Sequence, residues 1–368
     1  MKTYPMPVGN PKFFEGNILE VMNRPYGFFE VEVTTPKDLF YPIIQTRINT
    51  SEGYRTVAPL GTWTTVLSST EMYNAIDNFG YSFKINRGFL FERDIIYDKY
   101  VDHFNNIKSN TPKDNPMYLI SKLLMNGLFG KTGQDYRFNE TRLISNDNLL
   151  LLIQNKDIEV ISNTEIGIDL NFVVYFDKAK YKINSASPRS FNGCIAHASE
   201  ITSAARVEMS LVIKYLIENN YTIYYMDTDS FFINKPLPDH LVSHNILGKY
   251  KLENIYKEAI FLAPKVYAGI TQDGNEVIKI KGLSHDTINK DVTFDLLKSL
   301  LIKNKSLTFN QTKTFRNIAM GSINLLEQTY NLIPTENKRE LVFDDNNVFI
   351  STKPFVINKD KVIANSDP

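Results

Sequence analysis

The chain has 368 residues, of which 43% are hydrophobic and 22% charged, as is typical of a folded globular protein with two or three compact units. Its 41 basic and 41 acidic side chains cancel, so net charge does not support a nucleic-acid partner, which would need a local basic surface. The single cysteine, Cys194, excludes an internal disulfide and a cysteine-based metal site. No apolar run is long enough to span a bilayer, and the N-terminus lacks the features of a signal or transit peptide. We therefore expect a soluble intracellular protein with no membrane partner.

The first part of the chain is predicted to be strand-rich and then helical. Residues 1–90 contain short β-forming runs separated by prolines, a pattern that indicates strands and turns. An apolar spacing predicts a helix from Phe91 to about Ser109. After the breaker TPKDNP, Asn115 and Pro116 form a typical helix start, and this second helix is expected to run through Phe129.

The second part of the chain alternates between strand and helix patterns. Residues 134–190 are polar, rich in Asn and Asp, and strand-like. A long helix is expected from about Ile195 to Asn219, because apolar residues recur along one side. An acidic hairpin within Ile223–Ile233 follows, and the tail mixes helix and strand.

The acidic hairpin reads IYYMDTDSFFI and holds two carboxylates, Asp227 and Asp229, one residue apart. Aspartate favours turns because its side chain binds nearby backbone N–H groups, so the pair could serve the turn alone. The flanking runs are apolar on both faces, as expected for central strands, and like charges held close in such a place repel unless a cation neutralises them. Hard oxygen ligands favour Mg²⁺, and two carboxylate-held Mg²⁺ ions can activate an attacking oxygen and stabilise a leaving one.

A second candidate site lies on the helix that contains the run KLLMNGLFG. Lys122, Asn126 and Phe129 are spaced i, i+4 and i+7, so they share one face. A cation, an amide and an aromatic ring on one stripe suit a nucleotide, although a surface lysine beside a core phenylalanine would have the same spacing. Gly127 leaves room for a close approach, and Gly130 fits the end of a helix.

Four segments together resemble family B DNA polymerases. The helix motif K-x-x-x-N-G-x-F-G and the hairpin motif Y-x-D-T-D-S resemble motifs B and C of that family. Lys265-Val-Tyr267 is similar to its K-x-Y element, and Ile280-Lys-Gly-Leu283 is similar to the start of its thumb. The segments ITSAARVEM and TENKRELVF are similar to the protein-primed branch, especially the polymerases of mitochondrial linear plasmids. The resemblance runs from residue 1 to near the C-terminus, and the order and spacing of the four segments make it specific.

The resemblance implies an α+β fold, a fragment of a right-hand polymerase with palm, fingers and thumb and an antiparallel palm sheet. The expected divisions are a palm-proximal insertion-like region at 1–90, fingers helices with motif B at 91–133, a second insertion-like region at 134–190, a palm with motif C and K-x-Y at 191–278, and a thumb and C-terminal region at 279–368. In this branch of the family, an insertion at the second place closes around DNA and supports strand displacement.

The family also implies a role for each motif residue. Asp229 would be the main metal ligand and Asp227 would support it, so both are the candidate catalytic residues. Lys122 would contact the phosphates of the incoming nucleotide, and Asn126 would help to shape the nucleotide pocket. Phe129 stands where the family usually has tyrosine, and it keeps the stacking surface without the hydroxyl.

DNA contacts are expected in two places. Lys265 and Tyr267 would clamp the primer strand. The stretch Leu296–Leu326 carries five basic residues and no acid, which suits DNA phosphates, although such a run is often only a solvated face. Its place in the thumb-like region favours DNA binding, as do Lys279 and Lys281 on a nearby strand. The five basic residues of the stretch are Lys298, Lys303, Lys305, Lys313 and Arg316.

One element of the family is not found in this sequence. Two-metal phosphoryl transfer in family B also uses a carboxylate from motif A, D-x-x-S-L-Y-P, and Asp38 in DLFYP is the look-alike. Asp38 lies too close to its tyrosine and falls after YPMPVG, which follows motif A in the plasmid branch, so we predict a loop residue. We therefore expect a C-terminal portion that starts beyond motif A, lacks the exonuclease and extends a primer poorly by itself.

The leading hypothesis is the C-terminal part of a DNA-directed DNA polymerase, which transfers nucleotides from dNTPs onto a primer–template with two Mg²⁺ ions. Branch resemblance adds replication of a linear plasmid, a terminal priming protein as partner, and a mitochondrial location. The alternatives are a catalytically dead remnant that folds and binds DNA, and the palm of a reverse transcriptase or RNA polymerase, in which an acidic hairpin recurs. The Asp-Thr-Asp order and the upstream Lys/Asn helix favour family B over the palm of the other polymerases.

Overall fold

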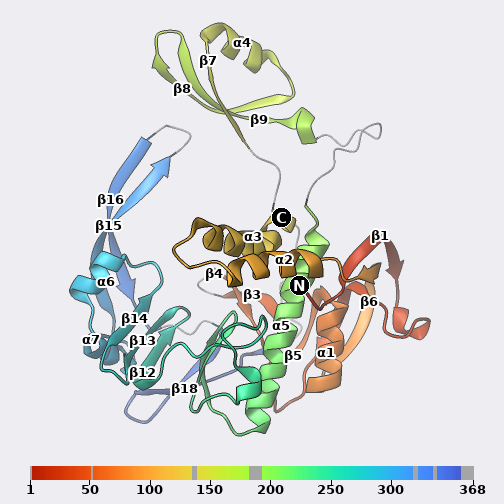
Figure 1. Cartoon of the computed structure of the whole chain (residues 1–368), viewed down its shortest axis with the longest axis vertical. Coiled ribbons are helices and arrows are strands. Elements are labelled where there is room, and N and C mark those ends of the chain that lie inside the picture. The colour runs from red at the N-terminus through yellow and green to blue at the C-terminus, as the bar shows by residue number, and fades with distance from the viewer. Residues whose placement is uncertain are drawn as a thin grey trace.

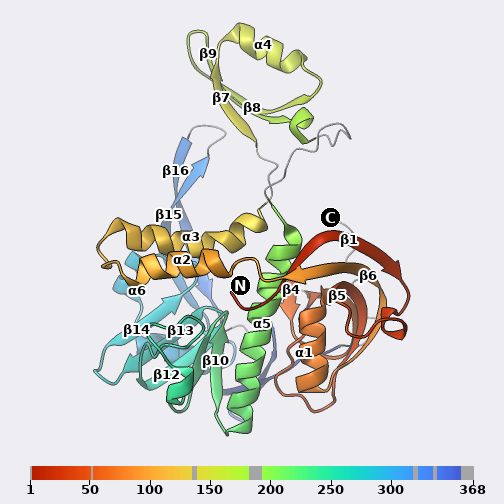
Figure 2. The ribbon, with the colours of Figure 1, turned by 45° about the vertical axis from the view of Figure 1, so that its right-hand side comes forward.

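The computed structural model describes residues 2–50, 53–134, 139–181, 193–317, 322–334 and 338–357. Most of them form one broad body, and a small unit of residues 139–181 stands apart above it (Figures 1 and 2). The long helix α5 (Ile195–Glu218) runs down through the body in both views, with sheets on either side. Its bounds agree with the predicted helix within one residue.

The largest sheet has five strands in the order β1–β6–β2–β5–β19. These are β1 (Met6–Glu15), β6 (Ser82–Asp94), β2 (Gly27–Thr34), β5 (Leu60–Ser68) and β19 (Val356–Ile357). Burial alternates along β2, so Phe29, Val31 and Val33 enter the core while the residues between them stay partly exposed. The single tryptophan, Trp63, is buried in the same core.

Helix α1 (Ser69–Phe79) covers the buried face of this sheet, and the prediction of strands and turns alone over residues 1–90 is wrong there. The helix starts where the Ser68 hydroxyl accepts the N–H of Thr70, and it ends at Gly80, whose φ of 71° lies in the left-handed region. Met72 and Ala75 bury one side of the helix, so its amphipathic spacing outweighs the strand-like context.

The last described strand, β19, closes the sheet from the far end of the chain. It pairs parallel with β5, and Ile357 is only 4% exposed within the core. The guanidinium of Arg339 donates two hydrogen bonds of 3.2 Å to the Phe40 carbonyl oxygen. The C-terminal region is therefore packed against the N-terminal part of the chain.

Helix α2 (Asp98–Ser109) begins later than predicted. A start at Phe91 is wrong because β6 continues in register with β1 as far as Asp94. A histidine of α5 then joins α2 to the sheet: His197 Nδ1 lies 2.7 Å from the Tyr97 hydroxyl, and its Nε2 lies 2.8 Å from a carbonyl oxygen of β1.

Helix α3 (Pro116–Thr132) starts as the sequence predicts, with the Asn115 side chain accepting the Met117 N–H at 2.9 Å. The prediction of an end at Gly130 is wrong. The helix continues to Thr132 and ends at Gly133, whose N–H bonds back to a carbonyl of the last turn. Glycine within a helix costs only about 1 kcal/mol relative to alanine, a preference that the rest of the structure can override.

The small upper unit contains a helix that the sequence did not reveal. It consists of β7 (Glu140–Ile144), α4 (Asn146–Gln154), β8 (Ile158–Gly167) and β9 (Leu170–Asp177), and the sheet order is β7–β9–β8. Leu149 of α4 packs on Val173 and Tyr175 in its own small core. The polar and leucine-rich run of α4 is a helix because Ser145 caps its start and the sheet covers one side.

A second large core lies on the other side of α5. It joins the antiparallel sheet β12–β13–β14 to two short helices and a long ribbon, with Phe294, Leu297 and Leu300 at its centre. These elements are β12 (Tyr256–Ala263), β13 (Val266–Thr271), β14 (Glu276–Ile280), α6 (His285–Asp291), α7 (Phe294–Lys298), β15 (Leu307–Asn317) and β16 (Ser322–Leu332). The remaining elements outside the site are β3 (Thr46–Thr50), β4 (Gly53–Val57), β17 (Glu340–Phe343), β18 (Phe349–Lys353) and the 3-10 helices Ile18–Glu20, Lys178–Tyr181, Asp239–Leu241 and Ser299–Leu301.

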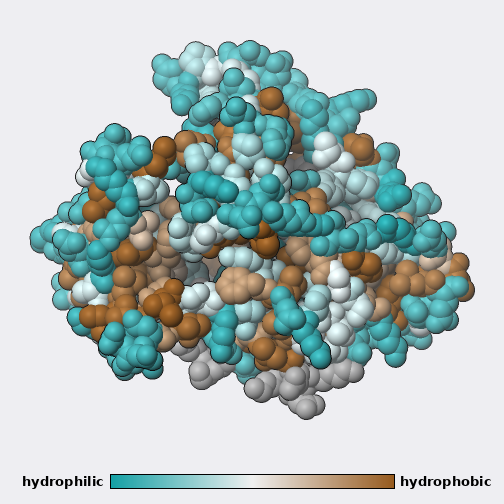
Figure 3. Space-filling view, turned by 90° about the horizontal axis from the view of Figure 1, so that it is seen from below, coloured by the Kyte–Doolittle hydropathy of each residue, from teal (hydrophilic) through white to brown (hydrophobic). Residues whose placement is uncertain are grey.

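The surface combines polar and apolar areas. On the face seen from below, brown apolar groups form several separate areas with teal polar groups between them (Figure 3). Within the described ranges, no helix has both the length and the apolar character needed to cross a bilayer.

Candidate active site

The two carboxylates lie at the tip of the predicted hairpin. Strands β10 (Ile223–Asp227) and β11 (Ser230–Ile233) are antiparallel, with Asp227 opposite Ser230 and only Thr228 and Asp229 in the turn. Thr228 has φ 52°, and a β-branched residue in the left-handed region costs roughly 1–3 kcal/mol. Local hydrogen bonds support the turn, including the Ser230 hydroxyl donating to the Asp227 carbonyl oxygen at 3.0 Å.

The hairpin is not central in a larger sheet, so that part of the prediction is wrong. β10 and β11 form a sheet of two strands, and the side chains of Tyr224 and Met226 are 57% and 42% exposed. On one face Tyr225 and Phe232 pack on other aromatic rings, and on the other face Phe231 packs on Tyr250 while Tyr224 and Met226 are exposed. The carboxylates therefore lie at an accessible edge, where an ion can reach them.

A second turn faces the carboxylates. Pro264 and Lys265 join β12 to β13, and Lys265 has φ 62°, at a turn position where glycine or asparagine is usual. The Lys265 ammonium forms an ion pair with the Asp227 carboxylate, and its backbone N–H donates to the Tyr225 hydroxyl at 2.8 Å. The hydrogen bond to Asp227 raises the pKa of the Lys265 amine. The structure thus brings the K-x-Y turn onto the first acid of the hairpin.

An aromatic cluster holds the two turns together. The Tyr225 ring stacks on Phe261 with centroids 5.3 Å apart, and Phe232 lies 5.0 Å from Phe261 and 5.1 Å from Tyr267. These rings come from β10, β11, β12 and β13, so they join the hairpin to the neighbouring sheet. Rigid apolar contacts of this kind fix the backbone positions from which Asp227 and Lys265 reach each other.

Tyr267 and Lys279 extend the same surface. They lie opposite each other on β13 and β14, and directly opposite residues share a face of the sheet. Burial raises the pKa of Tyr267, whose ring is part of the aromatic cluster. The Lys279 side chain is exposed, as is that of Lys281 just beyond the strand.

Two tyrosines near the acids received no role from the sequence. Tyr225 is the tyrosine of the Y-x-D-T-D-S motif, and a role beside Asp227 could have been inferred because residues two apart on a strand share a face. Tyr250 had no sequence signal, since it comes from a loop. Burial and the nearby negative charge of Asp229 raise its pKa to about 12, and its hydroxyl donates to the sulfur of Met209 on α5 at 3.3 Å.

The predicted nucleotide face lies on a separate element. Lys122, Asn126 and Phe129 are all exposed along α3, and a side-chain carbon at Gly127 would meet no atom within 4 Å. Helix α3 lies above the sheet β12–β13–β14 in Figures 1 and 2. No hydrogen bond or ion pair joins Lys122 to either aspartate among the described residues. Its role toward a triphosphate stays a prediction.

The predicted basic stretch does not form a single face. Lys313 pairs with Leu326 and Arg316 with Ile323 across the ribbon of β15 and β16, so the two cations lie on opposite faces of it. Lys303 lies over the Phe343 ring at 5.3 Å, and Lys305 is exposed just before the ribbon. In the same stretch Lys298 is ion-paired with Glu258, and Phe309 belongs to the core.

Asp227 and Asp229 offer carboxylate oxygens, which are the type of ligand that Mg²⁺ prefers, and two such residues would leave ligand positions for the oxygens of a substrate. Over the parts of the chain that the structure describes, no group of three or more His, Cys, Asp or Glu residues could hold a metal. The Lys265 ammonium on Asp227 shows that this carboxylate accepts a cation at its accessible edge. Mg²⁺ commonly binds one or two carboxylates and completes its shell with water and phosphate oxygens.

Asp38 lies in an exposed turn, as predicted for a loop residue.

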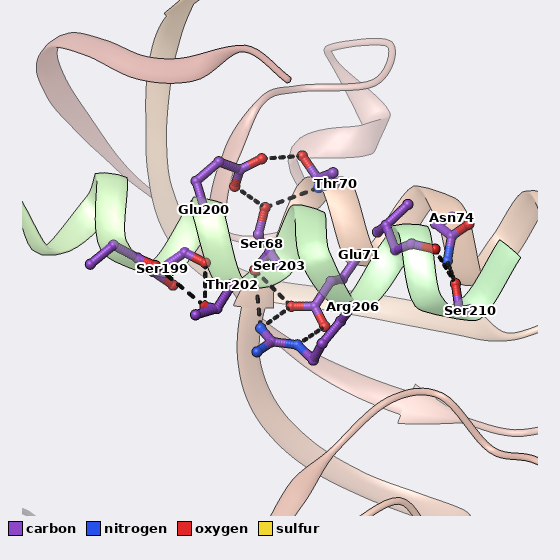
Figure 4. A network of polar contacts seen from close by, with 12 residues as sticks. Ser68, Thr70, Glu71, Asn74, Ser199, Glu200, Thr202, Ser203, Arg206 and Ser210 are labelled. Atoms are coloured by element: carbon purple, nitrogen blue, oxygen red, sulfur yellow. Dashed lines mark hydrogen bonds and ion pairs between the residues drawn. The ribbon is translucent and has the colours of Figure 1, made fainter. Parts of the chain in front are cut away.

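Helix α5, which leads into β10, is fixed to α1 by buried polar groups (Figure 4). The Arg206 guanidinium donates to both carboxylate oxygens of Glu71 at 2.6 and 2.7 Å, and the Ser203 hydroxyl donates to Glu71 at 2.8 Å. Glu200 accepts from the hydroxyls of Ser68 and Thr70, and burial raises its pKa. The contacts of Thr70, Glu71 and Asn74 with side chains of α5 join the two helices.

Comparison with known proteins gives one consistent result. The family described as DNA polymerase type B, organellar and viral, matches residues 1–219. A probable DNA polymerase of Ascobolus immersus is 33% identical over 369 residues, which cover 99% of this chain and 29% of the relative. A probable DNA polymerase of Neurospora intermedia is 33% identical over 336 residues, with 88% and 33% covered. The chain thus spans about a third of the length of these curated relatives.

Among solved structures, Phi29 DNA polymerase in a ternary complex with primer–template DNA and incoming nucleotides is similar, with a TM-score of 0.62 at 17% identity. The match covers 91% of this chain and 55% of that one. The expected α+β polymerase fold is confirmed: this is the fold of a DNA polymerase. The chain belongs to the organellar and viral type B DNA polymerases.

Proposed function

We propose that this chain provides the primer-binding and metal-binding side of a DNA-directed DNA polymerase. In this proposal Asp229 and Asp227 bind Mg²⁺, which polarises phosphate oxygens and lowers the barrier to nucleotidyl transfer. Lys265 and Tyr267 hold the primer strand. Lys122 binds the triphosphate of the dNTP.

The observation that supports this proposal most strongly is the ion pair between Lys265 and Asp227. The two residues are 38 apart in sequence and belong to different sheets, yet a lysine suited to backbone phosphate touches a carboxylate suited to metal. Nucleotidyl transfer needs both at the same place, because the primer end must meet the metal-bound triphosphate. Lys279 is an exposed cation on the same sheet face as Tyr267, where the primer strand would continue.

The finer parts of the proposal concern the helix α3, the basic ribbon and the biological setting. Asn126 and Phe129 shape the nucleotide pocket beside Lys122, and the cations Lys281, Lys303, Lys305, Lys313 and Arg316 add contacts to duplex phosphates. The family description, organellar and viral, supports an organellar setting. The resemblance to plasmid polymerases extends the proposal to a mitochondrial linear plasmid as the replicated molecule. A terminal protein then supplies the priming hydroxyl.

A second candidate function is DNA binding without catalysis. The observation in its favour is that the described residues offer two carboxylates at the hairpin and no third ligand near them. Two-metal transfer usually needs more than one anchoring element for its ions. The two functions differ in a single measurable property, which is extension of the primer.

Two assays on the 368-residue chain test the proposal. The first follows extension of a labelled primer with dNTPs and Mg²⁺, and the second follows anisotropy of a labelled primer–template with and without dNTP. We expect Asp229→Asn to remove extension and the metal-dependent gain in affinity, whereas Asp273→Asn, an exposed turn acid at the other end of β13, changes neither.

The outcomes separate the two functions. Slow extension that depends on Asp229 supports the polymerase, and duplex binding without any extension supports the DNA-binding alternative. Binding should weaken steeply with salt, and Lys313→Gln should reduce the slope of log affinity against log salt by about 1. A chain with no affinity for primer–template would contradict both.

A further inference from the structure

The turn that carries Lys265 is an unexpected place for a lysine. Its left-handed backbone, with φ 62°, would suit glycine, and the facing turn also contains a left-handed residue, Thr228. Backbone strain of this kind persists where the surrounding structure enforces it, often at functional sites. The aromatic cluster and the Tyr225 hydroxyl enforce it here, so the position of the Lys265 side chain has a purpose beyond the turn.

Lys265 is the counterion of the acid pair. Among the described residues, it alone forms an ion pair with either Asp227 or Asp229. The side chains of Lys265 and Asp227 are 51% and 33% exposed, so both are accessible to solutes. Two carboxylates one residue apart repel each other, and the ammonium lowers that repulsion.

A divalent cation and this ammonium compete for the same carboxylate. Mg²⁺ bound by Asp227 and Asp229 would repel an ammonium held in contact with Asp227, because like charges about 4 Å apart interact strongly near a protein surface. The lysine side chain is a point charge on a flexible stem, so it can leave without a backbone change. Its backbone N–H stays on Tyr225, which keeps the turn in place.

We propose that Lys265 is an exchangeable counterion that couples metal binding to phosphate binding. Without metal it neutralises Asp227, and a divalent cation displaces it. The released ammonium then binds a phosphate of the primer strand. Metal and primer–template consequently strengthen each other's binding, since thermodynamic linkage makes the effect equal in both directions. This inference rests on the proposed function, because it uses the same metal and primer sites.

The first experiment measures Mn²⁺ binding in the absence of DNA, from the electron paramagnetic resonance signal of free Mn²⁺. We expect Lys265→Met to bind Mn²⁺ about threefold more tightly than the unmodified chain, because the competing cation is gone and partly exposed ion pairs contribute modestly. Lys353→Met is the matched control, since it removes an exposed lysine paired with Glu340 at 3.0 Å and should leave Mn²⁺ affinity unchanged.

The second experiment measures the coupling. Anisotropy of a labelled primer–template is recorded at constant ionic strength with and without Mn²⁺. The metal should tighten binding by the unmodified chain about threefold, and this gain should disappear in Lys265→Met. Repeating the Mn²⁺ titration with a dNTP in place of the duplex identifies the phosphate: a gain with duplex alone assigns it to the primer strand, and a gain with dNTP alone overturns that assignment.

The results distinguish failure of this inference from failure of the proposed function. If Asp229→Asn leaves Mn²⁺ binding intact, the metal site is wrong and the exchange is wrong with it. If Asp229→Asn abolishes binding but Lys265→Met weakens it or leaves it unchanged, only the exchange is refuted. Lys265→Gly, which suits the left-handed backbone, serves as a second variant and should behave as Lys265→Met does. The fluorescence of the buried Trp63 confirms that each variant is folded.

Discussion

Replacing Arg206 by methionine should lower the free energy of unfolding by about 3 kcal/mol. Arg206 donates two short hydrogen bonds to Glu71, whose side chain is 9% exposed, while the arginine side chain itself is 37% exposed. Methionine has a similar length but leaves Glu71 as a buried, unpaired charge near Glu200. Loss of one partner of a buried pair costs about 3–5 kcal/mol, and the partial exposure of Arg206 places this case at the lower end.

Urea denaturation followed by Trp63 fluorescence is a suitable assay for this change. Trp63 is the single tryptophan of the chain, and it is buried in the core that α1 covers. The control is Arg87→Met, which removes an exposed arginine that donates two hydrogen bonds to Glu30 at 2.8 and 2.9 Å. Exposed ion pairs contribute about 0–1 kcal/mol, so Arg87→Met should unfold nearly as the unmodified chain does.

The double variant Glu71→Gln/Arg206→Met tests the reasoning directly. With the buried charge removed as well, the free energy of unfolding should return to within about 1 kcal/mol of the original value. The Ser203 hydroxyl can still donate to the glutamine oxygen. An Arg206→Met variant that loses less than about 1 kcal/mol, or a double variant no more stable than the single one, would refute the assignment of a buried charge pair.

Three further predictions use the same fluorescence assay, and the third also uses the anisotropy assay of primer–template binding. Burial raises the pKa of Glu200, so the folded chain keeps a proton on this carboxyl at pH values where the unfolded chain has lost it. The free energy of unfolding should therefore fall as the pH rises from the ordinary pKa of a glutamate through the raised pKa of Glu200. Glu200→Gln should remove that part of the pH dependence. Ile357→Ala should lower the free energy of unfolding by about 2–4 kcal/mol, because Ile357 is buried with only 4% exposed. A negligible change would show that β19 does not stabilise the core. Tyr225→Phe should lower the free energy of unfolding by about 1 kcal/mol, because the backbone N–H of Lys265 loses its acceptor. The same change should weaken primer–template binding, and an unchanged affinity would contradict a role of Tyr225 in positioning Lys265.

Several elements could be predicted because their causes are local. The start of α3 depends on Asn115 and Pro116, and the observed cap agrees with the prediction. The turn between β10 and β11 likewise forms at the two aspartates of the hairpin that was expected within Ile223–Ile233. Caps and tight turns depend on hydrogen bonds between residues a few positions apart, which a sequence displays directly.

Other elements were missed because competing local patterns were equally plausible. α4 consists of NDNLLLLIQ, a polar and then leucine-rich run within a strand-like region, and its helix depends on the sheet against which Leu149 packs. The continuation of β6 to Asp94 depends on pairing with β1. Tertiary contacts routinely override such weak local preferences.

The sequence by itself determined the family resemblance, the long helix α5 and the acidic hairpin. Only the tertiary structure decided which lysine meets that hairpin, since Lys265 is 38 residues from Asp227 and has no local feature that distinguishes it as the partner of a carboxylate. The same is true of Arg206 and Glu71, which are 135 residues apart. Contacts between distant segments depend on how sheets and helices pack, and packing is a property of the whole chain that no short pattern contains.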